Sequence, residues 1–449
     1  MSVCFKAGRF SKAAGAAVLA AGLLASPIAS AQAKEQFVPA ALFRVGPIAA
    51  IGIGIAGGWL DYMQLLNDRD GGIYGHKLVW EDCEFEYKPD RSVECYERMK
   101  KRVPTGLPFY NPLNTPASYA LTERVVQDKV PMLNIGLGRA DAADGRIFPW
   151  IFPLMTTYQS AAAAKIQFMG QREGGMAKLK GKKIVVLYHD TAYGKEILPI
   201  IDTMAGKFGF EVTKISVPPP GAEQQAQWLQ IRQIKPDWII MRTLGVMTVA
   251  AIKNAQRIGF PTDHMIGNWW ASSTEDMVAA GDAAKGVIGA TLYEDGNQFP
   301  LVQEIIKRYY TGGKKGHMAD PKLVGSSNYN NGLGQAIVKM EAIRMAMDKY
   351  GKKPVTGEQV RWALEHLNLD EKRLKELGVA GMMQPLKTSC ADHEGGGAVR
   401  FQQWDGTQWK LIGEWVKSDR SIVRPFLEEL AGRYAKEKGI TPRDCSKES

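Results

Sequence analysis

The 449-residue sequence lacks any long block of basic residues, although its formal net charge is +10. Basic and acidic residues alternate along most of the chain, and such mixing is typical of a solvated surface. We therefore expect no nucleic-acid partner. The content of 45% hydrophobic and 23% charged residues is that of a soluble globular protein, and the length suits two or three domains.

Long apolar runs are also missing, apart from one near the N-terminus. There, basic residues precede an apolar run over 13–24, and residues 29–33 (Ala-Ser-Ala-Gln-Ala) offer two small-x-small cleavage sites. This order is typical of a secretory signal peptide, and the run is too short to span a membrane. We predict that residues 1–33 are removed by cleavage after Ala33 or, alternatively, after Ala31; a buried first helix is the other interpretation. No cysteine lies near the cleavage site, so we expect a mature protein free in the periplasm, without a lipid anchor.

Cysteine is scarce, with five residues in the whole chain, and Cys4 leaves with the signal. The others are Cys83, Cys95, Cys390 and Cys445. An even number in an oxidising compartment favours disulfides, and of the three possible pairings the local spacing favours Cys83–Cys95 with Cys390–Cys445. Zinc is the alternative, but it requires closely spaced ligands, and His393 near Cys390 is too little to form a site. We therefore expect no metal.

Recognisable catalytic motifs are absent: the sequence contains neither Gly-x-Ser-x-Gly nor His-Glu-x-x-His. His189 and Asp190 end a predicted strand, where a general base is conceivable, but no nucleophile accompanies them at a recognisable spacing. Residues 52–57 (Gly-Ile-Gly-Ile-Ala-Gly) fit a dinucleotide fingerprint, with Glu81 and Asp82 near the end of the next strand. Against a cofactor stands the predicted export, because no nicotinamide pool is expected outside the cytoplasm. We expect no catalysis and no cofactor, and keep as the alternative an exported α/β enzyme that uses His189 and Asp190.

Strand-like and helix-like segments alternate from about residue 41 to residue 292. The series runs twice, with a strand-poor interval near 148–157, which predicts two doubly wound α/β lobes with parallel sheets. The later chain adds a long helical segment over 328–350, a hairpin over 399–415 and a polar terminal helix. A chain that returns to both lobes crosses between them more than once, and these crossings predict a multi-segment hinge.

Four short motifs occur along the chain in a characteristic order. They are Asn-Asp-Arg-Asp-Gly-Gly-Ile-Tyr-Gly-His-Lys-Leu at 67–78, Val-Pro at 130–131 followed by Gly136, His-Asp-Thr-Ala-Tyr-Gly-Lys-Glu at 189–196, and Ala-Gln-Arg-Ile-Gly at 255–259. Together they resemble the leucine/isoleucine/valine-binding protein family, the solute receptors of branched-chain-amino-acid-type ABC importers, over roughly residues 44–415. The resemblance implies a type I periplasmic-binding fold, a ligand between the lobes and a membrane permease as partner.

A division of the chain follows from the expected fold. The segments are a signal peptide over 1–33, a first lobe made of 34–156 and 294–395, and a second lobe made of 157–293 and 396–449, which ends in the closing hairpin and the terminal helix. We expect the mature protein to be a monomer.

The resemblance also implies ligand contacts at strand-end loops of both lobes. The positions in the first lobe are Tyr110, Asn111, Asn114, Thr115, Gly138 and Arg139, and those in the second lobe are Tyr193, Leu244, Trp269 and Trp270. Trp269 falls near the family's acidic residue, which pairs with the ligand ammonium, and an ammonium buried without an anion is costly.

Arg139 falls where amino-acid binders commonly have a threonine, and its guanidinium is able to hold a carboxylate through two parallel hydrogen bonds. We therefore predict an organic carboxylate with an apolar or aromatic body, with a branched-chain amino acid as the alternative. Two other interpretations remain open: Arg139 pairs with Asp141 or Asp144, and the tryptophans belong to the core.

The signal pattern predicts a secreted chain that starts at Lys34 or at Gln32. The intact mass of protein recovered from the periplasm measures this directly. A mass that still includes residues 1–31 would contradict the prediction.

Overall fold

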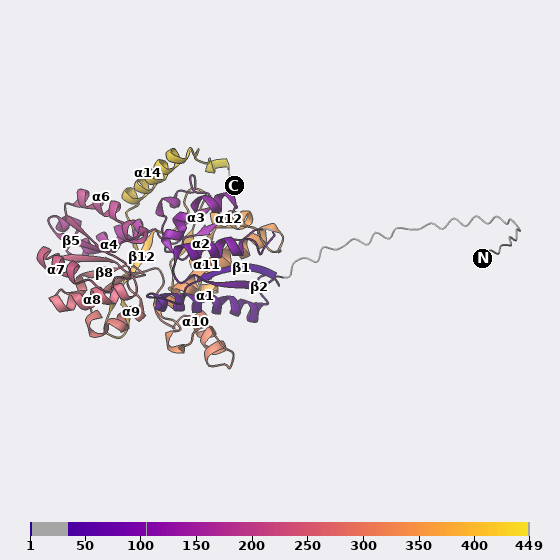
Figure 1. Ribbon diagram of the computed structural model, residues 1–449, viewed down its shortest axis with the longest axis horizontal. Helices are drawn as coiled ribbons and strands as arrows, with labels where there is room; N and C mark the ends of the chain where they lie inside the picture. Colours follow the sequence, from indigo (N-terminus) through magenta and orange to yellow (C-terminus); the bar gives the residue numbers. More distant parts are fainter. Residues whose placement is uncertain (2–34, 105, 448–449) are drawn as a thin grey trace. The chain divides into compact units, whose positions relative to one another are not determined.

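The computed structural model describes Met1 and residues 35–104 and 106–447. The predicted signal peptide and its cleavage sites lie outside the described residues. Within the described part of the chain, no helix is both long and apolar enough to cross a membrane. We call the part that contains strands β1–β4 the first lobe, and the part that contains the largest sheet the second lobe (Figure 1).

The first lobe is built on short parallel sheets. The strand pairs are β1 (Glu35–Leu42) with β2 (Lys77–Glu84), and β3 (Met132–Leu133) with β4 (Ile151–Phe152). The segment before β3 contributes only a single bridge, between Tyr110 and Met132. A further antiparallel pair lies late in the chain, β10 (Asn368–Leu369) with β11 (Leu386–Lys387).

Helices of this lobe come from both halves of the chain. They are α1 (Ala49–Asp70), α2 (Pro89–Met99), α3 (Thr115–Gln127), α10 (Pro300–Ile305), α11 (Ser327–Tyr350), α12 (Gly357–Glu365) and α13 (Glu371–Glu376). The longest, α11, is bounded by its sequence: the Ser326 side chain caps its first turn, and Gly351 ends it in the left-handed conformation. Its neighbour is α1, and the two lie side by side in Figure 1.

The glycine-rich segment 52–57 lies inside α1, where it packs against other chain segments. A Cβ atom on Gly54 would lie 2.6 Å from the Cβ of Asn328 in α11, and one on Gly58 would lie 2.1 Å from the carbonyl oxygen of Tyr329. Both distances are too short for a side chain. The glycines therefore allow the two helices to approach closely, and they do not form the phosphate-binding turn that a dinucleotide fingerprint requires.

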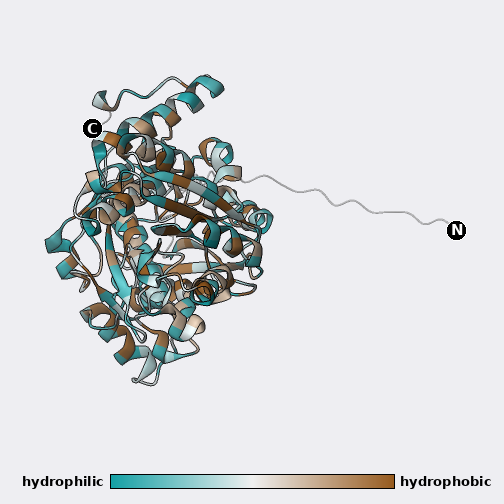
Figure 2. Ribbon diagram, turned by 90° about the vertical axis from the view of Figure 1, so that its left-hand side faces the viewer, coloured by the Kyte–Doolittle hydropathy of each residue, from teal (hydrophilic) through white to brown (hydrophobic). Residues whose placement is uncertain are grey.

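The second lobe is an eight-stranded sheet with the strand order β13-β12-β9-β8-β7-β5-β6, and β14 pairs with β12. The parallel strands are β5 (Lys183–His189), β6 (Glu211–Val217), β7 (Trp238–Arg242), β8 (Met265–Gly267) and β9 (Ile288–Thr291). Every residue of β7 is buried, as expected for a strand covered on both faces. The predicted parallel α/β sheet is thus present, and Figure 2 shows the chain in a second view, coloured by hydropathy.

The helices of the second lobe are α4 (Tyr158–Arg172), α5 (Ala192–Lys195), α6 (Leu198–Phe208), α7 (Gln225–Ile234), α8 (Val246–Ile258) and α9 (Thr274–Ala280). The chain leaves the sheet after β9 and returns to it through antiparallel strands, namely β12 (Ala398–Trp404), β13 (Trp409–Leu411) and β14 (Val416–Lys417). The predicted hairpin is present between β12 and β13, where the Asp405 side chain accepts hydrogen bonds from the backbone of Thr407 and Gln408.

The last helix, α14 (Arg420–Lys438), packs against both the short 3-10 helix η1 (Ala140–Ala143) and α4. Two disulfides are present, Cys83–Cys95 and Cys390–Cys445, and they are the pairs that local spacing favours. The second disulfide fixes the end of the chain beyond α14.

The Cys390–Cys445 disulfide should be the more stabilising of the two, because it closes the longer loop. The separations are 55 and 12 residues, and loop-closure entropy then predicts losses of roughly 4 and roughly 3 kcal/mol on removal. We expect the Cys390→Ser/Cys445→Ser variant to lose more free energy of unfolding than Cys83→Ser/Cys95→Ser, as measured by urea denaturation. Equal stability of the first variant and the wild type would contradict this.

Candidate ligand-binding site

The carboxyl ends of the parallel strands in the second lobe bring together residues that are far apart in the sequence. His189 ends β5 and is followed by Tyr193, Arg242 ends β7, and Trp269 and Trp270 follow β8. In open α/β sheets, ligands bind outside these carboxyl ends. This edge of the sheet is therefore where a site is expected.

One backbone carbonyl group of the first lobe contacts this edge of the sheet. The oxygen of Gly136 accepts hydrogen bonds from the indole nitrogens of Trp269 (3.0 Å) and Trp270 (2.9 Å). Gly136 has a φ of +70°, and a Cβ atom there would lie 2.9 Å from the indole nitrogen of Trp269. Only glycine fits this position. We call this set of contacts the Gly136 clamp.

Tyr158, the first residue of α4, completes the clamp. Its hydroxyl accepts a second hydrogen bond from the Trp270 indole (2.9 Å), and its ring stacks on Trp269 with centroids 5.5 Å apart. The sequence reasoning missed Tyr158, although it directly follows the strand-poor interval between the two series.

A small enclosed cavity lies beside the clamp, between the two lobes. Its free volume is about 10 Å³, which is close to the room that one water molecule needs. Its lining is apolar and comes from both lobes: Phe43, Ile48, Ile51, Tyr87, Leu113, Leu137, Leu244 and Trp270. A solute larger than about one water molecule can enter only if the lobes move apart.

Arg242 lies close to this cavity and was not predicted as a site residue. Its side chain is buried, with the guanidinium carbon 3.9 Å from the ring centre of Tyr158 and 4.1 Å from that of Tyr193. One terminal nitrogen donates to the carbonyl of Tyr193, whereas Nε has no hydrogen-bond partner among the residues that the structure describes. The signal that could have found it is its position as the last residue of a buried parallel strand.

Tyr193 is held at the same edge. Its hydroxyl lies 3.0 Å from the carbonyl oxygen of Thr243 and 3.0 Å from Oδ1 of Asn268. The predicted positions Tyr193, Leu244, Trp269 and Trp270 are thus gathered around one site.

Glu196, from the second lobe, reaches the first lobe directly. One carboxylate oxygen accepts from the backbone N–H of Ala140 (2.7 Å), and the other makes no hydrogen bond and lies against Gly138. Burial raises the pKa of Glu196 to about 7, although the Ala140 N–H and the positive charge of Arg242 act against the rise. A group whose charge is so easily lost makes this contact sensitive to pH.

Arg139 does not line the cavity. Its guanidinium forms an ion pair with Asp141 (2.9 Å) and stacks on the ring of Tyr434 in α14 at 4.0 Å. Of the two interpretations that the sequence left open, pairing with Asp141 is the one present. The partner ring comes from a helix nearly three hundred residues later in the chain, which the local sequence does not reveal.

The other predicted positions of the first lobe are engaged within that lobe. Tyr110 donates to a backbone carbonyl (2.6 Å), Asn111 donates to a glutamine of α11 (2.8 Å), and Asn114 caps α3. Thr115 accepts from the backbone N–H of Gly138 (3.2 Å), so this pair alone lies next to Glu196. Here these groups shape the loops of the site.

His189 and Asp190 each contact a different neighbouring side chain. The His189 ring bonds the hydroxyl of Thr191 (2.8 Å), and Asp190 pairs with Lys195 (2.7 Å). Burial lowers the pKa of His189 to about 4, so the ring is neutral near neutral pH. In the described ranges, no group of three or more acidic, histidine or cysteine side chains is arranged to hold a metal ion.

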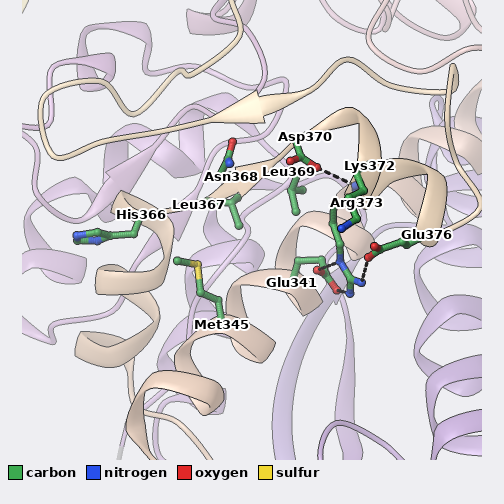
Figure 3. A pocket seen from close by; sticks show the side chains of 10 residues that line it. All are labelled: Glu341, Met345, His366, Leu367, Asn368, Leu369, Asp370, Lys372, Arg373 and Glu376. Atoms are coloured by element: carbon green, nitrogen blue, oxygen red, sulfur yellow. Dashed lines mark hydrogen bonds and ion pairs between the residues drawn. The ribbon is translucent and has the colours of Figure 1, made fainter.

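An open hollow on the first lobe also gathers charged side chains (Figure 3). It lies between the ends of α11, α12 and α13, and its arginine, Arg373, is already paired with Glu341 (2.8 Å) and Glu376 (3.0 Å). Because these charges satisfy one another, the hollow is a weaker candidate than the inter-lobe cavity.

Comparison with known proteins bears on both lobes. The family model described as "Periplasmic binding protein" matches residues 36–408. A solved structure from the Pseudomonas fluorescens group, described as an ABC transporter permease, is 49% identical with a TM-score of 0.85, and the match covers 92% of this chain and 99% of that one. The comparison with curated proteins gives no match.

Two more distant structures share the fold. A branched-chain amino acid ABC transporter protein from Thermus thermophilus with bound valine is 19% identical (TM-score 0.71; 86% of this chain, 99% of that one). A solute-binding protein from R. palustris in complex with benzoate is 17% identical (TM-score 0.65; 86% and 98%).

These similarities confirm the predicted type I periplasmic-binding fold of two α/β lobes joined by a hinge. Proteins of this family bind small molecules and work with the permeases of ABC transporters, and their name places them in the periplasm. The chain belongs to the family of periplasmic binding proteins and is a solute-binding receptor of an ABC importer.

Proposed function

We propose that the protein binds a small organic carboxylate or an amino acid in the inter-lobe cavity and delivers it to the membrane permease of an ABC importer. The observation that carries this proposal is the cavity itself, which is enclosed, apolar and lined from both lobes at the carboxyl edge of the large sheet. Distant structures with bound valine and benzoate support a small organic solute as the ligand. The protein acts by binding without catalysis, as a monomer in the periplasm, after cleavage at Ala33 or Ala31.

The hinge in this proposal consists of the segments that cross between the lobes. The lobes are residues 34–156 with 294–395, and 157–293 with 396–449. The exit of the chain from the large sheet after β9 and its return at β12 support these boundaries. Motion about such crossings opens and closes the cavity.

Among the contacts between the lobes, two groups lie close to the carboxyl edge of the large sheet, on different loops. One is the Gly136 clamp with the nearby Glu196–Ala140 contact. In the other, Glu275 of α9 accepts from the Ser326 hydroxyl (2.9 Å) and the Asn328 amide (2.6 Å) at the start of α11. Opening must break both groups of contacts. Closure around a bound solute then forms them again.

The cavity is tested by filling it. Purified wild-type protein is titrated with valine, benzoate and octanoate, with tryptophan fluorescence and calorimetry as readouts, because Trp269 and Trp270 lie at the closure. We expect one of these solutes to bind stoichiometrically without turnover, and Leu244→Trp to weaken that binding by about 30-fold or more, since the larger side chain occupies the space. Leu229→Trp is the control, because Leu229 is exposed on α7. If no solute binds, or if Leu244→Trp binds like the control, the proposal fails.

Glu196→Gln should reduce the pH dependence of thermal stability. Burial raises the pKa of Glu196 from its ordinary 4.5 to about 7, so the folded chain keeps a proton that the unfolded chain releases between these values. The stability from this group is complete below pH 4.5 and is lost as the pH rises through about 7. We expect the fall in melting temperature between about pH 5 and about pH 8 to be smaller in the variant.

Glu275 and Asp276 have pKa values raised to about 7 by burial and act in the same direction. The difference between Glu196→Gln and wild type therefore isolates Glu196. Glu223→Gln, at an exposed position, is the matched control. Identical pH profiles for Glu196→Gln and the wild type would show that Glu196 does not have this role.

A further inference from the structure

Arg242 is a buried cation without an acidic partner. Its side chain is 1% exposed, and among the residues that the structure describes no carboxylate forms an ion pair with it. Stacking on Tyr158 and Tyr193 offsets part of the cost of burial. The direct contacts of this guanidinium are two aromatic faces and one carbonyl. Its charge also acts on Glu196, but the two groups form no ion pair among the residues that the structure describes, so the guanidinium lacks a paired anion.

Arg139 provides a comparison within the same molecule. It too is buried and stacked on aromatic rings, those of Tyr434 and Phe148, but it also pairs with Asp141 at 2.9 Å. The fold therefore supplies an acid to one buried, stacked arginine and withholds it from the other. If Arg242 served only to support the neighbouring aromatic rings, it would not have to lack the acidic partner that Arg139 has.

The positive charge at Arg242 cannot be removed by losing a proton. Lys165, buried nearby in α4, shifts toward its neutral form, because burial and the charge of Arg242 lower its pKa well below the ordinary value. A guanidinium cannot become neutral in this way, since it stays protonated in proteins. The charge at the carboxyl edge of the sheet is therefore permanent and concentrated on Arg242.

Arg242 is separated from the cavity by residues that belong to the closure. Tyr158 covers one face of the guanidinium and receives a hydrogen bond from Trp270, which lines the cavity. Arg242 also acts on the lining residue Tyr87, since its charge opposes the rise that burial causes in the Tyr87 pKa. Trp270 is held to the first lobe by the Gly136 carbonyl, so opening of the lobes releases one of the two hydrogen bonds that fix this layer between the cavity and the guanidinium.

We propose that Arg242 is the residue that binds the carboxylate of the solute, with its unpartnered Nε–H as a donor, and that the ligand is an organic anion with an apolar body. The proposal rests on the function proposed above and adds to it the residue and the charge that select the ligand. The apolar lining receives the body of the solute, and the ion pair with Arg242 supplies the anion that the fold lacks.

Isothermal calorimetry on the full mature chain tests this with matched pairs of an acid and its amide: benzoate with benzamide, isovalerate with isovaleramide, and valine with valinamide. For the acid that binds the wild type, we expect the amide to bind about 10- to 100-fold more weakly. Arg242→Gln should weaken binding of the acid by a similar factor and leave binding of the amide unchanged. Arg242→Lys, which keeps the charge but loses the planar fork, should fall between them.

Two other variants separate this role from alternatives. Arg400→Gln, in β12 of the same sheet and paired with Glu294, is the control and should bind the acid within about threefold of the wild type. Arg139→Gln tests the carboxylate contact expected from the sequence; if it weakens acid binding while Arg242→Gln does not, the proposal is overturned. If Arg242→Gln does not fold, as judged by circular dichroism, the comparison of acid and amide on the wild type and on Arg242→Lys decides.

The outcomes distinguish the role of Arg242 from the receptor function. An amide that binds the wild type as tightly as its acid, or unchanged acid binding in Arg242→Gln, overturns the role of Arg242 but leaves the receptor function in place. Absence of binding by any acid or amide removes the proposed function, and the role of Arg242 with it. Comparison of valine with isovalerate shows whether an ammonium group is tolerated in an apolar cavity.

Discussion

One carbonyl oxygen governs the arrangement between the lobes. Gly136 accepts hydrogen bonds from two consecutive indoles, and the absence of a side chain at this position lets both rings approach. Buried indole N–H groups need an acceptor, and here one acceptor serves two donors. The orientation of Trp269 and Trp270 sets that of Tyr158, and Tyr158 in turn covers the guanidinium of Arg242. The cavity, its closure and its nearest charge are thus linked through a single backbone group.

The two lobes are joined by acids that are poorly solvated in the closed form. Glu196 meets a backbone N–H of η1 on one side, and Glu275 meets the start of α11 on the other. Burial raises the pKa of both to about 7, so each contact holds a carboxyl group whose charge is costly in the closed arrangement. Ionisation of either carboxyl group therefore weakens the closed arrangement.

Local patterns of the sequence were sufficient to predict the α/β class, the parallel sheet and the hairpin at Asp405. They also favoured the two disulfides, because each joins cysteines that are neighbours in their part of the chain. The glycine segment 52–57 fits a dinucleotide fingerprint, but it packs on α11, which lies far along the sequence, and a fingerprint contains no information about such a helix. Arg139 was predicted as a ligand contact, with pairing to an aspartate as the other interpretation, and its stacking on Tyr434 depends on α14. Whether Arg242 has an acidic partner depends on segments from many parts of the chain, so the lack of one can be recognised only in the folded structure.

The pairing of α1 with α11 also has a consequence for the order in which the chain acquires structure. More than half of the polypeptide separates these helices, and α1 presents glycines that leave its backbone bare until α11 covers them. The strands β5–β8, in contrast, are contiguous and can associate as soon as they are made. Contacts between distant segments form late, because closing a long loop is slow. The amino-terminal part of the molecule therefore stays uncommitted until the last third of the chain has emerged, which suits a polypeptide that is threaded through a narrow translocation channel before it folds.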